Sequence, residues 1–142
     1  MSTTELFEFM KEYFPRNPEL MTSLKPGAIW EYIIKAPKLD DQKSQTILTF
    51  HLIKREDETL ELHQGEAPIK PDLILYFTER AILNLISGFP SAKQYYKDYR
   101  QILNNPTYDI DLDYKINKPR LKLWRLGYRA WSKLYKFNSI QA

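Results

Sequence analysis

The stretch Pro71–Gly88 constrains the fold most, because it predicts a buried strand that passes into an apolar helix within a few residues. Asp72–Phe77 is almost wholly apolar, which is typical of a strand buried on both faces. Thr78 is placed to cap the helix by accepting a backbone N–H, and Gly88 is placed to end it with a positive φ. We expect this strand and helix at the centre of the core. The apolar surface of the helix consists of Ala81, Ile82, Leu83, Leu85 and Ile86.

Composition indicates a globular protein of a reducing compartment. The 142 residues have the length of a single domain, 1–142, and 14% of them are aromatic. The chain has no cysteine, which excludes disulfides, thiolate catalysis and zinc sites built on cysteine. No apolar window is long enough to span a membrane, and the first residues carry acids without the basic start of a secretion signal. We therefore expect a cytoplasmic protein.

Periodicity upstream of the central stretch predicts helices and then strands. An N-terminal helical segment, 1–24, begins with an amphipathic helix over Thr4–Phe14. Ala28–Ala36 alternates as a strand with Trp30, Tyr32 and Ile34 on one face. A hairpin follows over Gln45–Lys54 and Glu58–Gln64, and its shared apolar faces require an odd loop of about three residues.

Downstream of the central stretch the pattern predicts helix, strand and helix. Ser91 is placed to cap a helix that ends near Asn104. Alternation predicts a strand over Thr107–Ile116, with one face packed and the other solvated. A basic amphipathic helix follows over 118–137. This order predicts an α+β fold with a single, mostly antiparallel sheet of about five strands and helices packed on one face.

The last predicted helix concentrates the positive charge. Residues 118–142 hold seven Lys or Arg and no acid, whereas the rest of the chain holds fourteen basic residues against eighteen acids. On a continuous helix five of these cations fall within about 80° of one another, and this face is a candidate contact with an anionic membrane. The plainer interpretation is a docked helix with a solvated basic face. Nucleic acid is not expected, since the body is acidic and no nucleic-acid motif appears. The five cations are Lys122, Arg125, Arg129, Lys133 and Lys136.

Several segments resemble the sterol carrier protein 2 family of lipid-binding domains. PDLILYFTERAILNLISG resembles the family's strand, acidic helix start and leucine-rich helix ending in glycine, and SAKQYYKDYRQIL resembles its following helix. The three preceding segments WEYIIKA, QTILTFHLIKRE and ETLELHQG are similar to the family's three-strand meander. The resemblance covers about Lys25–Phe137. It departs from the family in lacking the glycines that flank the last strand, and in a closing helix that is longer, more aromatic and more basic.

The resemblance implies a hydrophobic tunnel between sheet and helices that holds fatty acyl, sterol or similar ligands, with no metal, no cofactor and no catalysis. We therefore expect a non-catalytic protein that binds or transfers a lipid-like molecule. The alternative is a module with a filled core that docks a protein or an anionic membrane through its basic aromatic helix. The residues we expect to line the tunnel are Trp30, Phe50, Leu75, Ile82, Ile86, Tyr95, Tyr99, Ile110, Leu112, Trp124 and Trp131.

Other polar groups favour structural roles over chemistry. Five tyrosines either fix a polar ligand head or form an ordinary core with hydroxyls satisfied at its edge. His51 and His63 lie roughly diagonal on the hairpin with only Glu61 as a further ligand, so a metal site is not expected. The triplet Asp109, Asp111 and Asp113 lacks the glycine and distal glutamate of a calcium loop. No nucleophile setting or phosphate loop appears, so catalysis is the weaker hypothesis. The tyrosines are Tyr95, Tyr96, Tyr99, Tyr108 and Tyr114.

Overall fold

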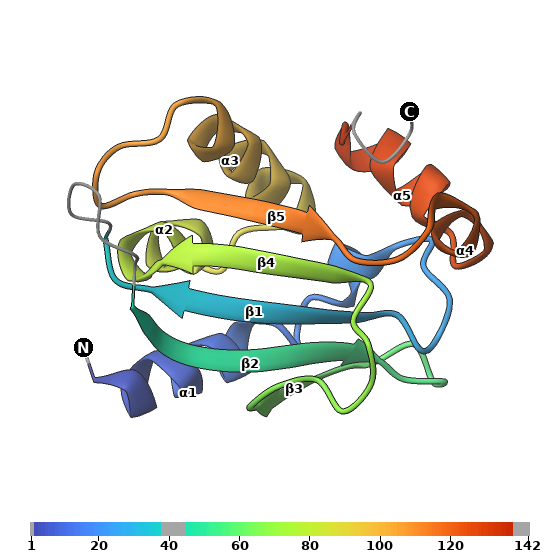
Figure 1. Ribbon diagram of the computed structural model, residues 1–142, viewed down its shortest axis with the longest axis horizontal. Coiled ribbons are helices and arrows are strands. Elements are labelled where there is room, and N and C mark those ends of the chain that lie inside the picture. Colours follow the sequence, from blue (N-terminus) through green and yellow to red (C-terminus); the bar gives the residue numbers. More distant parts are fainter. Residues whose placement is uncertain (1, 38–44, 138–142) are drawn as a thin grey trace.

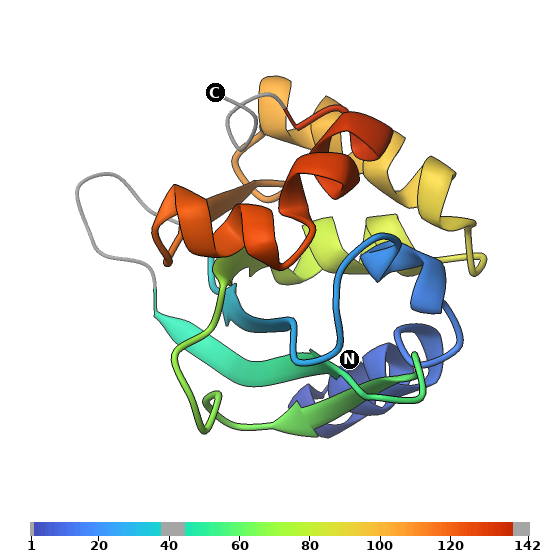
Figure 2. The same cartoon turned by 90° about the vertical axis from the view of Figure 1, so that its right-hand side faces the viewer.

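The computed structural model describes residues 2–37 and 45–137, which form a five-stranded sheet with helices on one face (Figures 1 and 2). The strand order is β3-β2-β1-β4-β5. Only β1 and β4 pair in parallel, and the other three pairings are antiparallel. The predicted α+β class with a mostly antiparallel sheet is therefore confirmed. The elements are α1 Thr3–Tyr13, the 3₁₀ turn η1 Pro18–Met21, β1 Ile29–Lys35, β2 Thr46–Lys54, β3 Leu60–Gln64, β4 Leu73–Thr78, α2 Glu79–Ile86, α3 Ala92–Asn104, β5 Leu112–Ile116, α4 Arg120–Arg125 and α5 Tyr128–Tyr135.

Alternation along β1 explains why the helices cover one face. Trp30, Tyr32 and Ile34 point to the same side and are at most 2% exposed, whereas the residues between them are only half-buried. The helices lie together on one side of the sheet (Figure 2), and on that side Tyr32 contacts Phe14 and Trp30 contacts Trp131. The aromatic rings of β1 thus form the floor of the space between sheet and helices.

The central stretch folds as a strand and helix, with one correction. Thr78 accepts a hydrogen bond from the Ala81 backbone N–H and caps α2, and Gly88 has a φ of 80° after the helix ends. The prediction of a strand buried on both faces is wrong, because Ile74 and Tyr76 are only half-buried. They lie on the face of the sheet that the helices do not cover.

The hairpin keeps the predicted odd parity but has a longer loop. Lys54 pairs with Leu60, so five residues connect β2 and β3 instead of about three. The loop is two residues longer than expected, and two residues are one full period of side-chain alternation in a strand. The apolar faces of β2 and β3 therefore still coincide, and Leu52 pairs with Leu62. The longer loop also places His51 directly opposite His63, and not diagonal to it as we expected.

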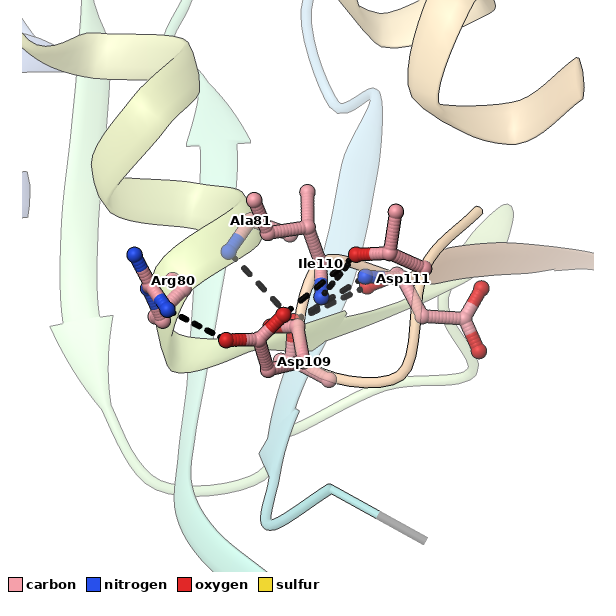
Figure 3. Close-up of polar contacts among 7 residues, drawn as sticks. Arg80, Ala81, Asp109, Ile110 and Asp111 are labelled. Atoms are coloured by element: carbon pink, nitrogen blue, oxygen red, sulfur yellow. Dashed lines mark hydrogen bonds and ion pairs between the residues drawn. The ribbon is translucent and has the colours of Figure 1, made fainter. Parts of the chain in front are cut away.

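The prediction of a strand from Thr107 is wrong for its first half, since β5 begins at Leu112. The reason is the cap of α2, where the Thr78 hydroxyl donates to the Asp109 carbonyl and accepts from the Asp111 N–H. Asp109 also pairs with Arg80 on α2 (Figure 3). These contacts bind residues 109–111 to the helix start as a turn, and the alternating Tyr108 is left 59% exposed.

The predicted single helix over 118–137 is two helices. Gly127 separates α4 from α5 with a φ of 99°, which favours glycine. Lys25 N–H donates to the Leu126 carbonyl at 2.9 Å and holds the break against the segment that follows η1. The five cations therefore do not share one helical face, because Lys122 and Arg125 lie on α4 while the others follow the break.

Candidate functional site

A small apolar cavity lies where the resemblance implies a tunnel, between the sheet and helices α3 and α5. Its volume is about 20 Å³, which is room for roughly one water molecule, whereas ligand pockets usually measure some 300 Å³ or more. The expected open tunnel is therefore wrong for this conformation, because aromatic side chains fill the space. We call this cavity and its walls the aromatic chamber. It is lined by Trp30, Tyr32, Leu73, Leu75, Tyr95, Tyr96, Tyr99, Tyr114, Trp131 and Phe137.

The periodicities of three elements bring this lining together. On β1 and β4, residues two apart face the helices, which places Trp30 beside Tyr32 and Leu73 beside Leu75. On α3, residues four apart share a face, so Tyr95 and Tyr99 point the same way. The chamber therefore has a sheet floor and a tyrosine wall.

Phe137 closes the chamber from the side of α5. Lys136 adopts a left-handed conformation with a φ of 63°, which turns the chain back after the helix, and Phe137 N–H donates to the Ser132 carbonyl at 2.8 Å. The Phe137 ring stacks on Trp131 with centroids 5.1 Å apart and an interplanar angle of 8°. It also meets Tyr99 edge-on at 5.6 Å. One side chain near the end of the described chain thus occupies the place between helices and sheet.

Three aromatic residues of α3 and α5 bind backbone carbonyls through their polar groups, which are therefore not free for a ligand. Tyr96 Oη and Trp131 Nε1 both donate to the Leu20 carbonyl, at 2.7 Å and 2.9 Å. Tyr135 Oη donates to the Glu19 carbonyl. The bonds from Tyr96 and Trp131 satisfy the Leu20 carbonyl in the irregular backbone of η1, and the bond from Tyr135 adds to those that the Glu19 carbonyl accepts from Thr22. The structural interpretation holds for these three aromatic residues.

Tyr99 differs from these neighbours. Its side chain is 3% exposed, and its hydroxyl has no hydrogen-bond partner within the described part of the chain. Burial, and secondarily Tyr114, raises the pKa of Tyr99 well above its ordinary value, so the hydroxyl is neutral at physiological pH. A buried polar group left unpaired costs about 1 to 3 kcal/mol and calls for an explanation. The Tyr99 hydroxyl is therefore an uncharged hydrogen-bonding group that has no partner within residues 2–37 and 45–137.

Replacement of Tyr99 and of Tyr96 by phenylalanine tests whether the hydroxyl of Tyr99 is unpaired while that of Tyr96 is paired. Tyr99→Phe is expected to leave the free energy of unfolding unchanged or to raise it by about 1 kcal/mol, because it removes an unpaired group. Tyr96→Phe is the matched control and should lower it by about 0.5 to 1.5 kcal/mol, because it removes one hydrogen bond to the Leu20 carbonyl while Trp131 Nε1 still donates to that carbonyl. Urea unfolding followed by circular dichroism measures both. A loss in Tyr99→Phe as large as that in Tyr96→Phe would show that the Tyr99 hydroxyl is paired.

A buried carboxylate secures one end of the chamber. Asp72 is fully buried, and its Oδ1 lies 2.6 Å from Lys118 Nζ. Its Oδ2 accepts from Tyr128 Oη at 2.6 Å and from the Ile29 N–H at 3.1 Å. Tyr128 Oη in turn accepts from Trp30 Nε1 at 2.7 Å, and burial followed by the Asp72 charge raises the pKa of Tyr128. Both carboxylate oxygens are occupied, so this group ties β1 and β4 to the C-terminal helices.

The structure brings together some of the predicted lining and separates the rest. Trp30, Leu75, Tyr95, Tyr99 and Trp131 line the chamber. Three others, Phe50, Ile82 and Ile86, are buried elsewhere in the core. The remaining three are Leu112, which is buried on β5, Ile110, which is half-buried in the turn before it, and Trp124, which is 38% exposed on α4.

The prediction missed Tyr32, Leu73, Tyr96, Tyr114 and Phe137. Alternation with Trp30 and Leu75 marks Tyr32 and Leu73 as members of the same face, so the sequence holds a signal for both. Phe137 has no such signal, because its position depends on the left-handed Lys136.

The two histidines and the aspartates contact protein groups. His51 Nδ1 lies 3.0 Å from the Gly65 carbonyl, and His63 Nε2 lies 2.9 Å from Glu61 Oε1. Hydrogen bonds from the Arg80 and Thr107 side chains lower the pKa of Asp109, and the Arg80 bond is the larger cause. Within residues 2–37 and 45–137 no three His, Cys, Asp or Glu side chains are grouped as a metal ion requires.

Comparisons with known proteins find similarity only among solved structures. No family model matches the sequence, and no curated protein matches it. Among solved structures the chain is similar to one described as "UbiJ-SCP2 Ubiquinone synthesis protein", with 12% sequence identity and a TM-score of 0.43 over 95% of this chain and 91% of that one. A likeness at this level assigns neither a family nor a ligand. In the described segments no helix is both long and apolar enough to cross a bilayer.

Proposed function

We propose that this protein binds an apolar, lipid-like ligand between its sheet and its helices, without catalysis, and that Phe137 gives up its place when the ligand enters. The observation that carries the proposal is the buried Tyr99 hydroxyl in the wall of the aromatic chamber, which has no hydrogen-bond partner in the described segments. A closed core built only for stability gains nothing from that hydroxyl, since phenylalanine has the same ring without the cost. A ligand with one polar group gives it a partner.

Entry of such a ligand requires the chamber to enlarge. Phe137 contacts Trp131, Tyr96, Tyr99 and Tyr114, so its withdrawal frees a wall shared by three elements. Burial of a phenylalanine ring stabilises the closed chamber by about 1.5 to 3 kcal/mol. Displacement of the ring therefore reduces the net free energy of ligand binding by about this amount. An apolar ligand gains about 25 cal/mol for each Å² that it buries, which offsets the cost for an acyl chain or a ring system.

The chemistry of the chamber restricts the polar end of the ligand. The walls are aromatic and apolar, and the Tyr99 hydroxyl stays neutral because its pKa is raised by burial. A charged group would lose its hydration there without a counter-ion. We infer a ligand with one uncharged hydrogen-bonding group on an apolar body, such as a hydroxyl or an ester carbonyl. A fatty acid would meet this requirement by taking up a proton as its carboxyl leaves water, because burial favours the neutral form of a carboxyl.

Phe137→Ala tests the proposal through affinity. The variant does not have to displace the ring, so a fluorescent long-chain fatty acid is expected to bind it about 10- to 100-fold more tightly than the unmodified protein, in line with the burial energy of the ring. Leu134→Ala is the matched control, because Leu134 is 53% exposed on α5 and outside the chamber. Fluorescence titration, run where circular dichroism shows each protein folded, gives the three affinities.

Two outcomes would contradict the proposal. No binding by either the unmodified protein or Phe137→Ala is the result expected of a docking module with a filled core. Equal affinity of all three proteins would mean that the fatty acid binds outside the chamber. Native mass spectrometry of purified material adds an independent readout, since a co-purifying lipid adds its own mass to the chain.

A further inference from the structure

Exposed apolar side chains gather where β5 ends and α4 begins. Ile116, Leu121 and Trp124 are 37%, 58% and 38% exposed, although they lie within nine positions of one another. Leu121 and Trp124 are three residues apart on α4 and therefore project from neighbouring positions on the helix. Figure 1 shows α4 at the end of the sheet where β5 stops. Clustered apolar exposure of this kind marks a contact surface.

Unpaired positive charge surrounds these side chains. Arg120, Lys122 and Arg125 on α4 are exposed, and the Arg129 guanidinium lies over the Trp124 ring, 5.3 Å from its centroid. In the described parts of the chain, none of these four cations forms an ion pair with a carboxylate. Lys118, by contrast, is committed to Asp72. The cations around Trp124 are therefore available to an external anion.

We propose that this surface docks on an anionic lipid bilayer. We call it the α4 surface, and it consists of Ile116, Arg120, Leu121, Lys122, Trp124, Arg125 and Arg129. Tryptophan with flanking lysine and arginine is the combination that suits the headgroup region, where the ring enters the interface and the cations meet phosphate. The α4 surface replaces the five-cation face expected from sequence, since Gly127 breaks that face.

Charge and apolar exposure favour a bilayer over nucleic acid as the partner of this surface. Exposed leucine and tryptophan at the centre of the patch need an apolar phase, which nucleic acid phosphates do not supply. The remainder of the chain carries more acids than bases, so a long phosphate backbone would be repelled beyond α4. A bilayer meets only this end of the molecule and supplies both the anions and the apolar phase.

Flotation with phosphatidylcholine vesicles, with and without phosphatidylserine, tests the α4 surface. We expect the unmodified protein to float with the phosphatidylserine vesicles at low salt and much less at high salt. The double substitution Lys122→Gln and Arg125→Gln should lower the partition coefficient about 30-fold, because each cation near an anionic membrane contributes about fivefold. Trp124→Ser with Leu121→Ser should lower binding at every salt concentration.

The control carries the same kinds of change on α5. Lys133→Gln with Leu134→Ser removes one exposed cation and one exposed leucine outside the α4 surface. Flotation of this control should equal that of the unmodified protein, and circular dichroism verifies that all variants are folded. The proposal is overturned if the unmodified protein ignores phosphatidylserine vesicles, or if the α5 control loses as much binding as the α4 variants. The affinity of the α4 variants for the fatty acid should be unchanged. This result would show that membrane docking by the α4 surface and ligand binding in the chamber are independent.

Discussion

Gly127→Ala is expected to lower the free energy of unfolding by about 4 kcal/mol. A methyl group at this position would lie 2.1 Å from the Ser23 carbonyl oxygen and 3.0 Å from its carbonyl carbon. Both are backbone atoms, so no side-chain rotation relieves the overlap. The φ of 99° adds the strain of a left-handed conformation for any residue with a Cβ. The break between α4 and α5 must then move away from the segment that follows η1.

Gly88→Ala is the matched control for this prediction. Its φ of 80° is also left-handed, but a methyl group there meets no atom within 4 Å. The control therefore carries the conformational cost alone, about 1 kcal/mol. Urea denaturation of the two variants separates strain from overlap. Equal losses in the two variants would mean that the close approach of Gly127 to Ser23 is not part of the stable fold.

Lys118→Met is expected to lower the free energy of unfolding by about 3 kcal/mol. The substitution keeps an unbranched side chain but leaves the Asp72 carboxylate fully buried, with Oδ1 unpaired. Tyr128 and the Ile29 N–H still bind Oδ2, but they cannot compensate the charge. An uncompensated buried charge is more costly than the loss of an exposed ion pair.

Two further variants test whether the loss of stability in Lys118→Met comes from the buried ion pair with Asp72. Arg80→Met removes the partner of Asp109 at the surface and should leave the stability nearly unchanged, because water screens that pair. Adding Asp72→Asn to Lys118→Met should recover part of the loss, since the carboxylate charge is then gone. If Lys118→Met behaves like Arg80→Met in thermal unfolding, the Asp72 pair does not secure the C-terminal helices.

The sequence predicted the helices and strands correctly where contacts between residues close in the sequence determine them. The alternation along β1, the Thr78 cap and the Gly88 stop all depend on contacts within a few residues, and the structure has each of them. The break at Gly127 depends on Ser23, about one hundred positions away in the sequence, and helical periodicity continues across it. The first half of the predicted last strand also depends on a distant contact, because Thr78 binds Asp109 and Asp111 and holds that stretch as a turn.

The chamber shows a similar division. Its place between sheet and helices and half of its lining follow from faces that the sequence displays, such as that of Trp30 on β1. Its volume does not follow, because it depends on how the rings of Tyr96, Trp131 and Phe137 interlock in three dimensions. Residue patterns predict which side chains face inward, and they carry no information on how completely those side chains fill the space.

The central claim is that a ligand takes the place of Phe137 beside Tyr99. The most direct measurement is a crystal structure of the unmodified protein grown with a long-chain fatty acid that carries bromine, located by its anomalous signal. The account predicts a bromine site within the aromatic chamber, with the Phe137 ring lifted from Trp131. It is contradicted if Phe137 remains stacked on Trp131 at 5.1 Å while bromine lies only on the outer surface or is absent.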